Sequence, residues 1–485
     1  MTQSRRSFLG SVSNGLQGIA LASLFSQDLY QSSDLLAAET HGSHAPRAHN
    51  LLPRQPHFRP RAKAVIQLMM QGGPSQVDLF DYKPELEKHH GKSILKEIAK
   101  DLSSPDSAGG LMKSPFKFQQ HGDCGMWVSE LLPHLSQHVD DIALVRSMFN
   151  THQNHEPAIY KIQSGKTMPG LPTLGAWTVY GLGSENQNLP AYVVLANPDG
   201  RLPVNTVQNW QPGYLPPLYQ GTRIRAKGTP ILNLQSETEE PDAVVDLSRD
   251  LLGRLDRIHQ SKRAGHLELD ARIASYELAA RMQISANEAL DLSAETEETL
   301  SNYGIDEKET DNFGRQCLLA RRLVESGVRF IQVHPPGQGW DNHSNIGSSL
   351  PSICKQTDKP VAGLLADLKQ RGLMDDVLVV WGGEFGRLPI AQLRGDDPKK
   401  SGRDHGPAGF SVWFAGAGIK GGTMYGSTDE IGWRAAENRV SVADWHATIL
   451  HLLGMDNEEL FYESHGFKER LTGVEKVRVV KEIFA

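Results

Sequence analysis

Hydrophobic runs and amphipathic stretches alternate along the second half of the chain. Three runs of strand length are rich in apolar residues: 328–334, 377–381 and 410–415. Three longer stretches place apolar residues at helical spacing: 313–326, 352–372 and 442–453. Strands that alternate with helices at this interval are typical of a mostly parallel sheet covered on both faces. The pattern predicts an α/β fold, a three-layer sandwich with a largely parallel central sheet.

The first half is less regular. It predicts two further strands, at 64–70 and 142–148, and three helices, at 83–90, 129–137 and 152–165. Residues 91–125 are rich in Ser, Gly and Asp and indicate a loop, whereas the many prolines of 190–233 indicate an irregular surface insertion. One long helix is expected over 248–285, with a packing stripe of Leu, Ile and Ala.

The N-terminus has the form of an export signal. Arg5 and Arg6 precede Ser-Phe-Leu and a weakly apolar stretch, as in a twin-arginine signal. That stretch is too short and too polar for a stable membrane span. We therefore expect a signal peptide over residues 1–38, a linker over 39–61 that is rich in His, Pro and Arg, and one domain over 62–485. The expected location is periplasmic or extracellular.

Charge and cysteine content exclude several classes of protein. The 485 residues carry a formal net charge of −7 with a pI near 6.3, so the chain lacks the basic balance of a general nucleic-acid binder. Its three cysteines are widely spaced and form no CxxC pair. This argues against a disulfide framework and against a zinc–thiolate site.

Acidic and imidazole side chains gather just beyond the predicted strands. Glycine-rich loops there carry Asp341, His343, Asp404 and His405, and His446 lies early in an apolar helix. The carboxyl ends of parallel strands form the ligand crevice of such sheets, so these groups are placed to converge. Carboxylate and imidazole donors without thiolates suit a divalent ion, with zinc as our expectation and manganese or calcium as alternatives.

Several motifs resemble, in order, the bacterial domain-of-unknown-function family 1501. They are QGGPSQVDLFDYKPEL at 71–86, then WDNH, GEFGR, GRDHGP, GAGIKGG and WHATILHLLG, and together they span nearly all of 62–485. The resemblance implies an alkaline phosphatase-like fold and a relationship to exported, sulfatase-like proteins of the alkaline phosphatase and sulfatase superfamily.

The resemblance also implies two metal positions. Asp341, His343 and His446 match one of them, although Asp341 and His343 are closer in sequence than the usual pair. Asp404 and His405 match the other, which also takes an acidic or amide group at the end of the first strand. Gln71 stands at that position, and Asp78 follows as a source of negative charge.

The nucleophile is where the chain departs most from a sulfatase. In HEPAIYKIQSG, at 155–165, His155 occupies the nucleophile position, and no cysteine lies in such a motif. A formylglycine sulfatase is therefore excluded as the leading interpretation. Thr151, Ser75 and His155 are the candidate nucleophiles, with His155 alternatively a metal ligand or a cap of its helix.

Two arginines could neutralise an ester's charge. Arg387 and Arg403 suit a bidentate contact with phosphate or sulfate, or an ion pair within the protein, and Glu384 suits a partner that orients a histidine. The leading hypothesis is a metal-dependent hydrolase of phosphate or sulfate esters, acting on a small-molecule or polysaccharide ester. The alternative is a non-catalytic metal-binding envelope protein that keeps the fold. The sequence leaves the oligomeric state open.

Overall fold

The computed structural model describes the part of the chain that carries the predicted domain. It covers residues 50–94, 105–196, 203–228, 230–231, 241–263, 267–393, 400–464 and 466–485. Two compact units are distinguished, Met1–Asn50 and Leu51–Ala485. The predicted signal peptide over 1–38 and the first half of the linker over 39–61 lie outside the described residues. The second unit contains the whole of the predicted domain.

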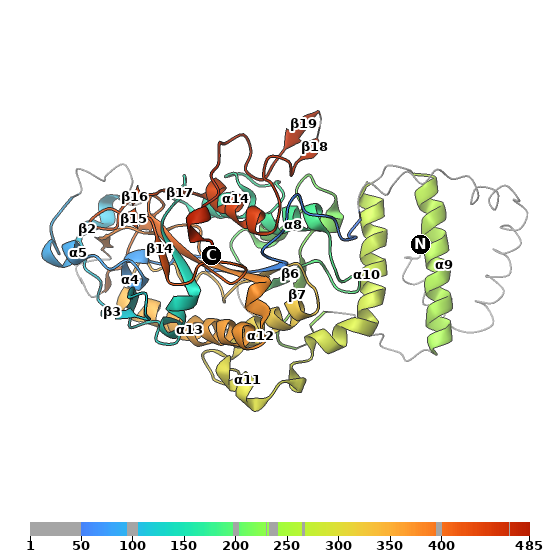
Figure 1. Cartoon of the computed structure of the whole chain (residues 1–485), viewed down its shortest axis with the longest axis horizontal. Helices are drawn as coiled ribbons and strands as arrows, with labels where there is room; N and C mark the ends of the chain where they lie inside the picture. Colours follow the sequence, from blue (N-terminus) through green and yellow to red (C-terminus); the bar gives the residue numbers. More distant parts are fainter. Residues whose placement is uncertain are drawn as a thin grey trace, which may run out of the picture. The chain divides into compact units, whose positions relative to one another are not determined.

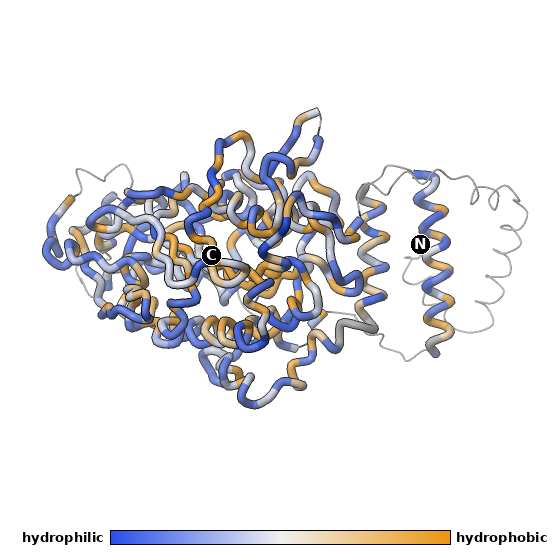
Figure 2. The backbone as a smooth tube through the Cα atoms, viewed as in Figure 1, coloured by the Kyte–Doolittle hydropathy of each residue, from blue (hydrophilic) through white to orange (hydrophobic). Residues whose placement is uncertain are grey.

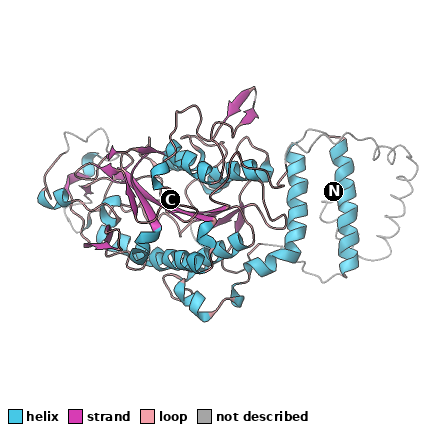
Figure 3. Cartoon of the chain, viewed as in Figure 1, coloured by secondary structure: helices cyan, strands magenta, loops and turns pink. Residues whose placement is uncertain are grey.

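A nine-stranded sheet forms the centre of this unit (Figures 1 and 3). Its strands run in the order β14-β5-β13-β9-β1-β8-β6-β7, with β17 beside β5. They are β1 (Ala64–Met69), β5 (Ile142–Phe149), β6 (Tyr192–Leu195), β7 (Thr222–Ile224), β8 (Phe330–Val333), β9 (Val377–Gly382), β13 (Phe410–Ala415), β14 (Thr423–Tyr425) and β17 (Val440–Ser441). Only β13 runs antiparallel to its neighbours β5 and β9, so the sheet is largely parallel.

Helices cover both faces of the sheet (Figure 1). Successive residues of β1 point to opposite sides, and every residue of the strand is buried. Ile66 and Leu68 pack with residues of α12 (Asp311–Glu325) and α13 (Ile346–Gln370), whereas Val65 belongs to the core beneath helices of the other face. Those helices are α7 (His155–Ser164), α8 (Leu174–Leu182) and α14 (Val442–Leu452). The predicted three-layer α/β sandwich is confirmed.

Further helices and short strands surround the central sheet. The helices are α4 (Gln76–Leu79), α5 (Pro84–Lys88), α9 (Asp242–Ser261), α10 (Leu267–Leu290) and α11 (Glu297–Asn302). The strands are β2 (Ala108–Leu111), β3 (Phe118–His121), β4 (Met126–Ser129), β10 (Gly386–Arg387), β11 (Ile390–Gln392), β12 (His405–Gly406), β15 (Ser427–Thr428), β16 (Ala435–Glu437), β18 (Tyr462–Ser464) and β19 (Phe467–Glu469).

Four sequence-based predictions of local structure were wrong. The supposed insertion at 190–233 contains β6 and β7, because the four apolar residues Tyr192–Leu195 pair with β8 inside the sheet. The supposed loop at 91–125 contains β2 and β3. In place of an α-helix at 129–137 the chain ends β4 and forms a 3-10 helix at Leu135–Asp141. The long helix expected over 248–285 is two helices, α9 and α10.

Cysteine pairing and membrane-spanning helices can also be examined in the described residues. Cys124, Cys317 and Cys354 are unpaired, and the last two are buried. No helix within the described ranges is both long enough and apolar enough to cross a membrane.

His334, directly after β8, gives a pH dependence to stability. Its side chain is buried, neither ring nitrogen has a protein hydrogen-bond partner, and burial lowers its pKa to about 3. The unfolded chain binds a proton at this histidine near pH 6.5, whereas the native chain binds one only near pH 3. The free energy of unfolding therefore falls as the pH drops from about 6.5 towards 3. Relative to a non-titrating His334→Gln variant, the wild type should lose about 2 kcal/mol between pH 7 and pH 5, as measured by guanidinium unfolding. A difference that does not change with pH would contradict this assignment.

Candidate metal centre

One edge of the sheet collects loops from distant parts of the chain. The parallel strands β5, β8 and β9 all end there. His155, at the start of α7, follows β5, and the loops after β8 and β9 carry Asp341 and Glu384. Because β13 runs antiparallel to β5 and β9, its beginning rather than its end lies at this edge. His405, five residues before β13, therefore reaches the same place. The sheet order brings together residues separated by 250 positions in the sequence.

Four of these side chains converge. His155, Asp341, His343 and His405 each offer one ligand atom, and these atoms lie within 4.8 Å of one another. Asp341 Oδ1 is 3.2 Å from His155 Nε2, 2.9 Å from His343 Nε2 and 3.5 Å from His405 Nε2. His343 Nε2 and His405 Nε2 are 2.9 Å apart. Three imidazole nitrogens thus surround one carboxylate oxygen.

Two partners orient the imidazoles. His155 Nδ1 lies 2.6 Å from Glu384 Oε1, and His343 Nδ1 lies within hydrogen-bond distance of Gln392 Oε1. An Nδ1–H that donates to an oxygen leaves Nε2 to face the centre, as in many metal-binding histidines. The role of Glu384 in orienting a histidine was predicted from sequence, and this contact is in agreement with it.

The charges are strongly coupled. Burial alone would lower the pKa of His155, but hydrogen bonds to Asp341 and Glu384 raise it to about 9. Burial would raise the pKa of Asp341, yet hydrogen bonds from His155, His343 and His405 and the nearby Arg387 hold it well below its usual range. Burial lowers the pKa of His405. The group therefore favours an ionised Asp341 with positive charge beside it.

The residues fit a divalent metal ion. Three imidazole nitrogens and one carboxylate oxygen are the donors that zinc, manganese and similar ions accept, and no thiolate competes. His155, Asp341 and His343 are only partly buried, so the group is open to solvent on one side. Among the described residues, this group could hold a metal ion.

Asp404 and His446, both predicted ligands, are not among the four. The Asp404 carboxylate accepts the backbone N–H of His405 at 2.8 Å. His446 is fully buried on α14, where its Nε2 lies 2.8 Å from the Ile162 carbonyl oxygen. Burial lowers the pKa of His446 to about 3. His446 faces the helix layer rather than the loops at the sheet edge.

Asp78 and Ser75 form a separate buried group with an arginine. Arg403 Nε donates to Asp78 Oδ2 at 2.6 Å, and Arg403 Nη2 donates to Asp78 Oδ1 at 3.0 Å. The Ser75 hydroxyl donates to the same carboxylate. All three side chains are buried. Asp78 is thus paired with a charge inside the protein, and the Ser75 hydroxyl is used in the same contact.

Arg387 supports the centre from within the protein. Its Nη2 donates to Asp341 Oδ1 at 2.6 Å, its Nε donates to the Gly73 carbonyl at 3.0 Å, and its Nη1 donates to the Arg403 carbonyl at 3.0 Å. The side chain is 1% exposed. Arg387 therefore holds Asp341 in place and does not present an open fork to a ligand.

Thr151, the remaining candidate nucleophile, is exposed. It lies in the loop between β5 and α7, four residues before His155. His155 itself is part of the four-residue group, with Nδ1 2.6 Å from Glu384 Oε1 and Nε2 3.2 Å from Asp341 Oδ1. Of the three candidate nucleophiles, Thr151 is exposed, His155 is half-buried and Ser75 is buried.

Gln392 and Gly72 were missed by the sequence analysis. The Gly72 N–H donates to Glu384 Oε1 at 3.0 Å, and its φ is +112°. A Cβ on Gly72 would lie 2.5 Å from the Asp341 backbone nitrogen, so only glycine allows this approach. The Gly-Gly pair after β1 was a usable signal. Nothing in the sequence around Gln392 marked it.

Gln392 should matter for metal affinity. In a Gln392→Leu variant, His343 loses the acceptor that fixes its ring, and we expect affinity for zinc to fall about 10- to 100-fold. Competition with a chelator would measure the change, and Gln119→Leu, an exposed glutamine of β3, is the matched control. Equal affinity in the two variants would show that Gln392 does not position a ligand.

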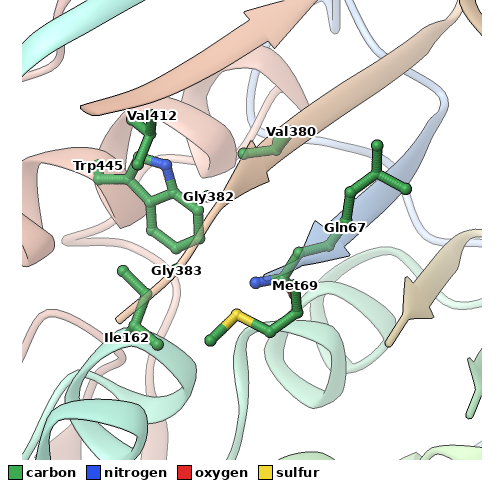
Figure 4. A pocket seen from close by; sticks show the side chains of 9 residues that line it. Gln67, Met69, Ile162, Val380, Gly382, Gly383, Val412 and Trp445 are labelled. Carbon is green, nitrogen blue, oxygen red and sulfur yellow. The ribbon is translucent and has the colours of Figure 1, made fainter. Parts of the chain in front are cut away.

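A small cavity lies behind the loop that carries Glu384 (Figure 4). Strands β1, β9 and β13 and helices α7 and α14 line it, with Met69, Ile162 and Trp445 among the side chains turned toward it. Gln67 is its main polar lining residue. This cavity belongs to the apolar core and is not a continuation of the four-residue group.

Comparison with known proteins yields a family and several remote structural likenesses. No curated protein matches the sequence. Solved structures that are similar include the lipoteichoic acid synthase LtaP from Listeria monocytogenes, the PsFucS1 sulfatase from Pseudoalteromonas sp. and the phosphonate monoester hydrolase of Agrobacterium radiobacter. Their identities are 10%, 11% and 11%, with TM-scores of 0.33, 0.30 and 0.32. The matches cover 84%, 84% and 82% of this chain and 76%, 69% and 74% of theirs. Scores this low carry no argument about a shared site or reaction.

The family assignment stands on the sequence. A family model described as "Protein of unknown function (DUF1501)" matches residues 62–484. That range is nearly the whole domain expected over 62–485, and it includes all four residues of the candidate metal centre. The chain belongs to the DUF1501 family.

Proposed function

We propose that this protein is an exported, metal-dependent hydrolase of phosphate or sulfate esters. The observation that carries the proposal is the convergence of three imidazole nitrogens on Asp341 at the open edge of the sheet. Several strand loops supply the group, and it is partly open to solvent. A purely structural role would not require that opening. The Arg5-Arg6 motif supports export to the periplasm or beyond.

Each residue has a defined part in this proposal. A bound divalent ion would act as a Lewis acid toward an ester oxygen. Asp341, His155, His343 and His405 would hold the ion, Glu384 and Gln392 would keep two of the rings in position, and Arg387 would keep Asp341 ionised. The exposed Thr151 hydroxyl is the candidate nucleophile, because Ser75 is buried against Asp78 and His155 belongs to the ligand group.

One observation favours the alternative of a non-catalytic metal-binding protein. Both arginines predicted to neutralise an anionic ester are buried and donate to protein acceptors, Arg387 to Asp341 and Arg403 to Asp78. A hydrolase would then rely on the ion for positive charge, because histidines that bind a metal ion are neutral. A protein that only binds its metal would need no such charge.

Two measurements on purified protein distinguish a hydrolase from a protein that only binds metal. Elemental analysis should find about one zinc, manganese or calcium per chain, and a panel of aryl phosphate and aryl sulfate esters should show turnover that a chelator abolishes. Thr151→Ala should then lose turnover and keep the metal, with His152→Ala as the neighbouring control. Bound metal without turnover of any ester would favour the binding protein, and protein purified without metal that takes up none would refute both. Cell fractionation tests export.

A further inference from the structure

Helix α9 carries an apolar stripe that the described residues leave uncovered. Among the described residues, five of the thirteen exposed large hydrophobic side chains lie in its twelve-residue stretch Val244–Leu255. They are Val244 (43% exposed), Leu247 (70%), Leu251 (42%), Leu252 (43%) and Leu255 (46%). Figure 2 shows apolar and polar residues alternating along this helix. A soluble protein rarely leaves a contiguous apolar patch exposed unless something binds it.

The covered side of α9 is a different face. Arg249, Gly253 and Asp256 are half-buried, and Gln260 donates a hydrogen bond to Asp270 of α10. At about 100° per residue, these positions lie opposite Leu251. The half-buried positions therefore lie on the polar and small side of the helix. The apolar stripe points the other way.

Apart from Leu252, which lies about 100° to one side, the stripe is symmetric about Leu251. Val244, Leu247, Leu255 and the half-buried Ile258 stand seven and four residues before it and four and seven residues after it. At about 100° per residue, these four side chains fall within about 40° of Leu251. Two antiparallel copies would bring Leu251 against Leu251, Leu247 against Leu255 and Val244 against Ile258. Such a surface is self-complementary, as a two-fold interface requires.

The charges beside the stripe agree with the same arrangement. One edge carries Asp246 and Asp250 in the first half of the helix and Arg254 and Arg257 in the second half, all exposed. In an antiparallel pair, Asp250 would face the partner's Arg254 and Asp246 would face the partner's Arg257. A parallel pair would bring this edge against the opposite edge of the partner, where Val245, Ser248 and Leu252 offer no charged partner. Within one chain, Asp250 Oδ2 and Arg254 Nη2 lie 2.8 Å apart, so each would exchange or share this partner on pairing.

We propose that α9 is a homodimerisation helix that pairs antiparallel with α9 of a second copy of this chain, centred on Leu251. The helix is about 30 Å long, so the pair buries less than a standard interface of about 800 Å² per partner. We therefore expect reversible dimers with a dissociation constant near the micromolar range. The metal centre plays no part in this contact.

Cross-linking of the full chain tests the register. A Leu251→Cys thiol would meet its own copy at the two-fold axis, whereas Val244→Cys thiols would lie about 21 Å apart, about 14 residues along the pair. A short bismaleimide should join Leu251→Cys chains efficiently and Val244→Cys chains at the background rate of the wild type, whose Cys124 is half-buried. Equal cross-linking of the two variants would overturn the register.

Sedimentation measures the association itself. Leu251→Glu should raise the dissociation constant at least about 10-fold, whereas Phe467→Glu, an exposed apolar residue of β19, should leave it unchanged. Asp250→Arg should weaken dimers through repulsion from the partner's Arg254, and Asp250→Arg with Arg254→Asp should restore them. A wild-type chain that is monomeric at all concentrations, or one whose α9 associates with lipid vesicles or with residues 1–50 instead, would overturn the proposal.

Discussion

Replacing Asp341 by asparagine should remove the metal from the purified protein. The amide would keep the size of the side chain but lose the charge on which His155, His343 and His405 converge, so we expect metal affinity to fall by at least about 100-fold. Turnover, if present, should fall with it. Elemental analysis after dialysis against a weak chelator provides the measurement.

Asp404→Asn is the matched control for this experiment. Asp404 is a buried carboxylate next to His405, and sequence motifs predicted it to be a ligand, but it is not among the four converging residues. Metal retained by Asp404→Asn and lost by Asp341→Asn would support the group seen in the structure. The reverse result would favour Asp404 as a ligand, as the sequence motifs predicted, and would exclude the present centre.

Breaking the Arg403–Asp78 pair should cause the largest loss of stability. Both side chains are almost fully inaccessible to solvent, and Arg403 binds both carboxylate oxygens. In Arg403→Met the Asp78 charge would remain buried without its partner, which costs about 3–5 kcal/mol. A lower guanidinium midpoint, or failure to accumulate folded protein, would report the loss.

Two further variants test whether the unpaired Asp78 charge causes this loss of stability. Adding Asp78→Asn to Arg403→Met removes the unpaired charge, so part of the stability should return. Lys63→Met breaks an exposed pair with Asp376 and should cost no more than about 1 kcal/mol. If Arg403→Met were no more harmful than Lys63→Met, the buried pair would contribute little to the fold.

The sequence was most informative where strands and helices are long and regular. Buried parallel strands are apolar runs, so β1, β5, β9 and β13 were predicted within one or two residues. It failed at β6, a four-residue strand among prolines, because local composition there resembles a surface loop. It also joined α9 and α10 into one helix, since the helical pattern continues on both sides of the break.

For the site, the sequence determined which loops carry the chemistry, and only the tertiary structure decided which residues meet. The positions of Asp341, His343 and His405 beyond the strands were readable because strand ends share one edge of a parallel sheet. His155 joins them because β5 lies beside the antiparallel β13, a pairing that no local pattern encodes. His446 is turned into the helix layer because the packing of α14 sets its direction. Helices and strands can be predicted because their periodicity involves residues that are close in sequence. Which site residues meet depends instead on the order of strands in the sheet.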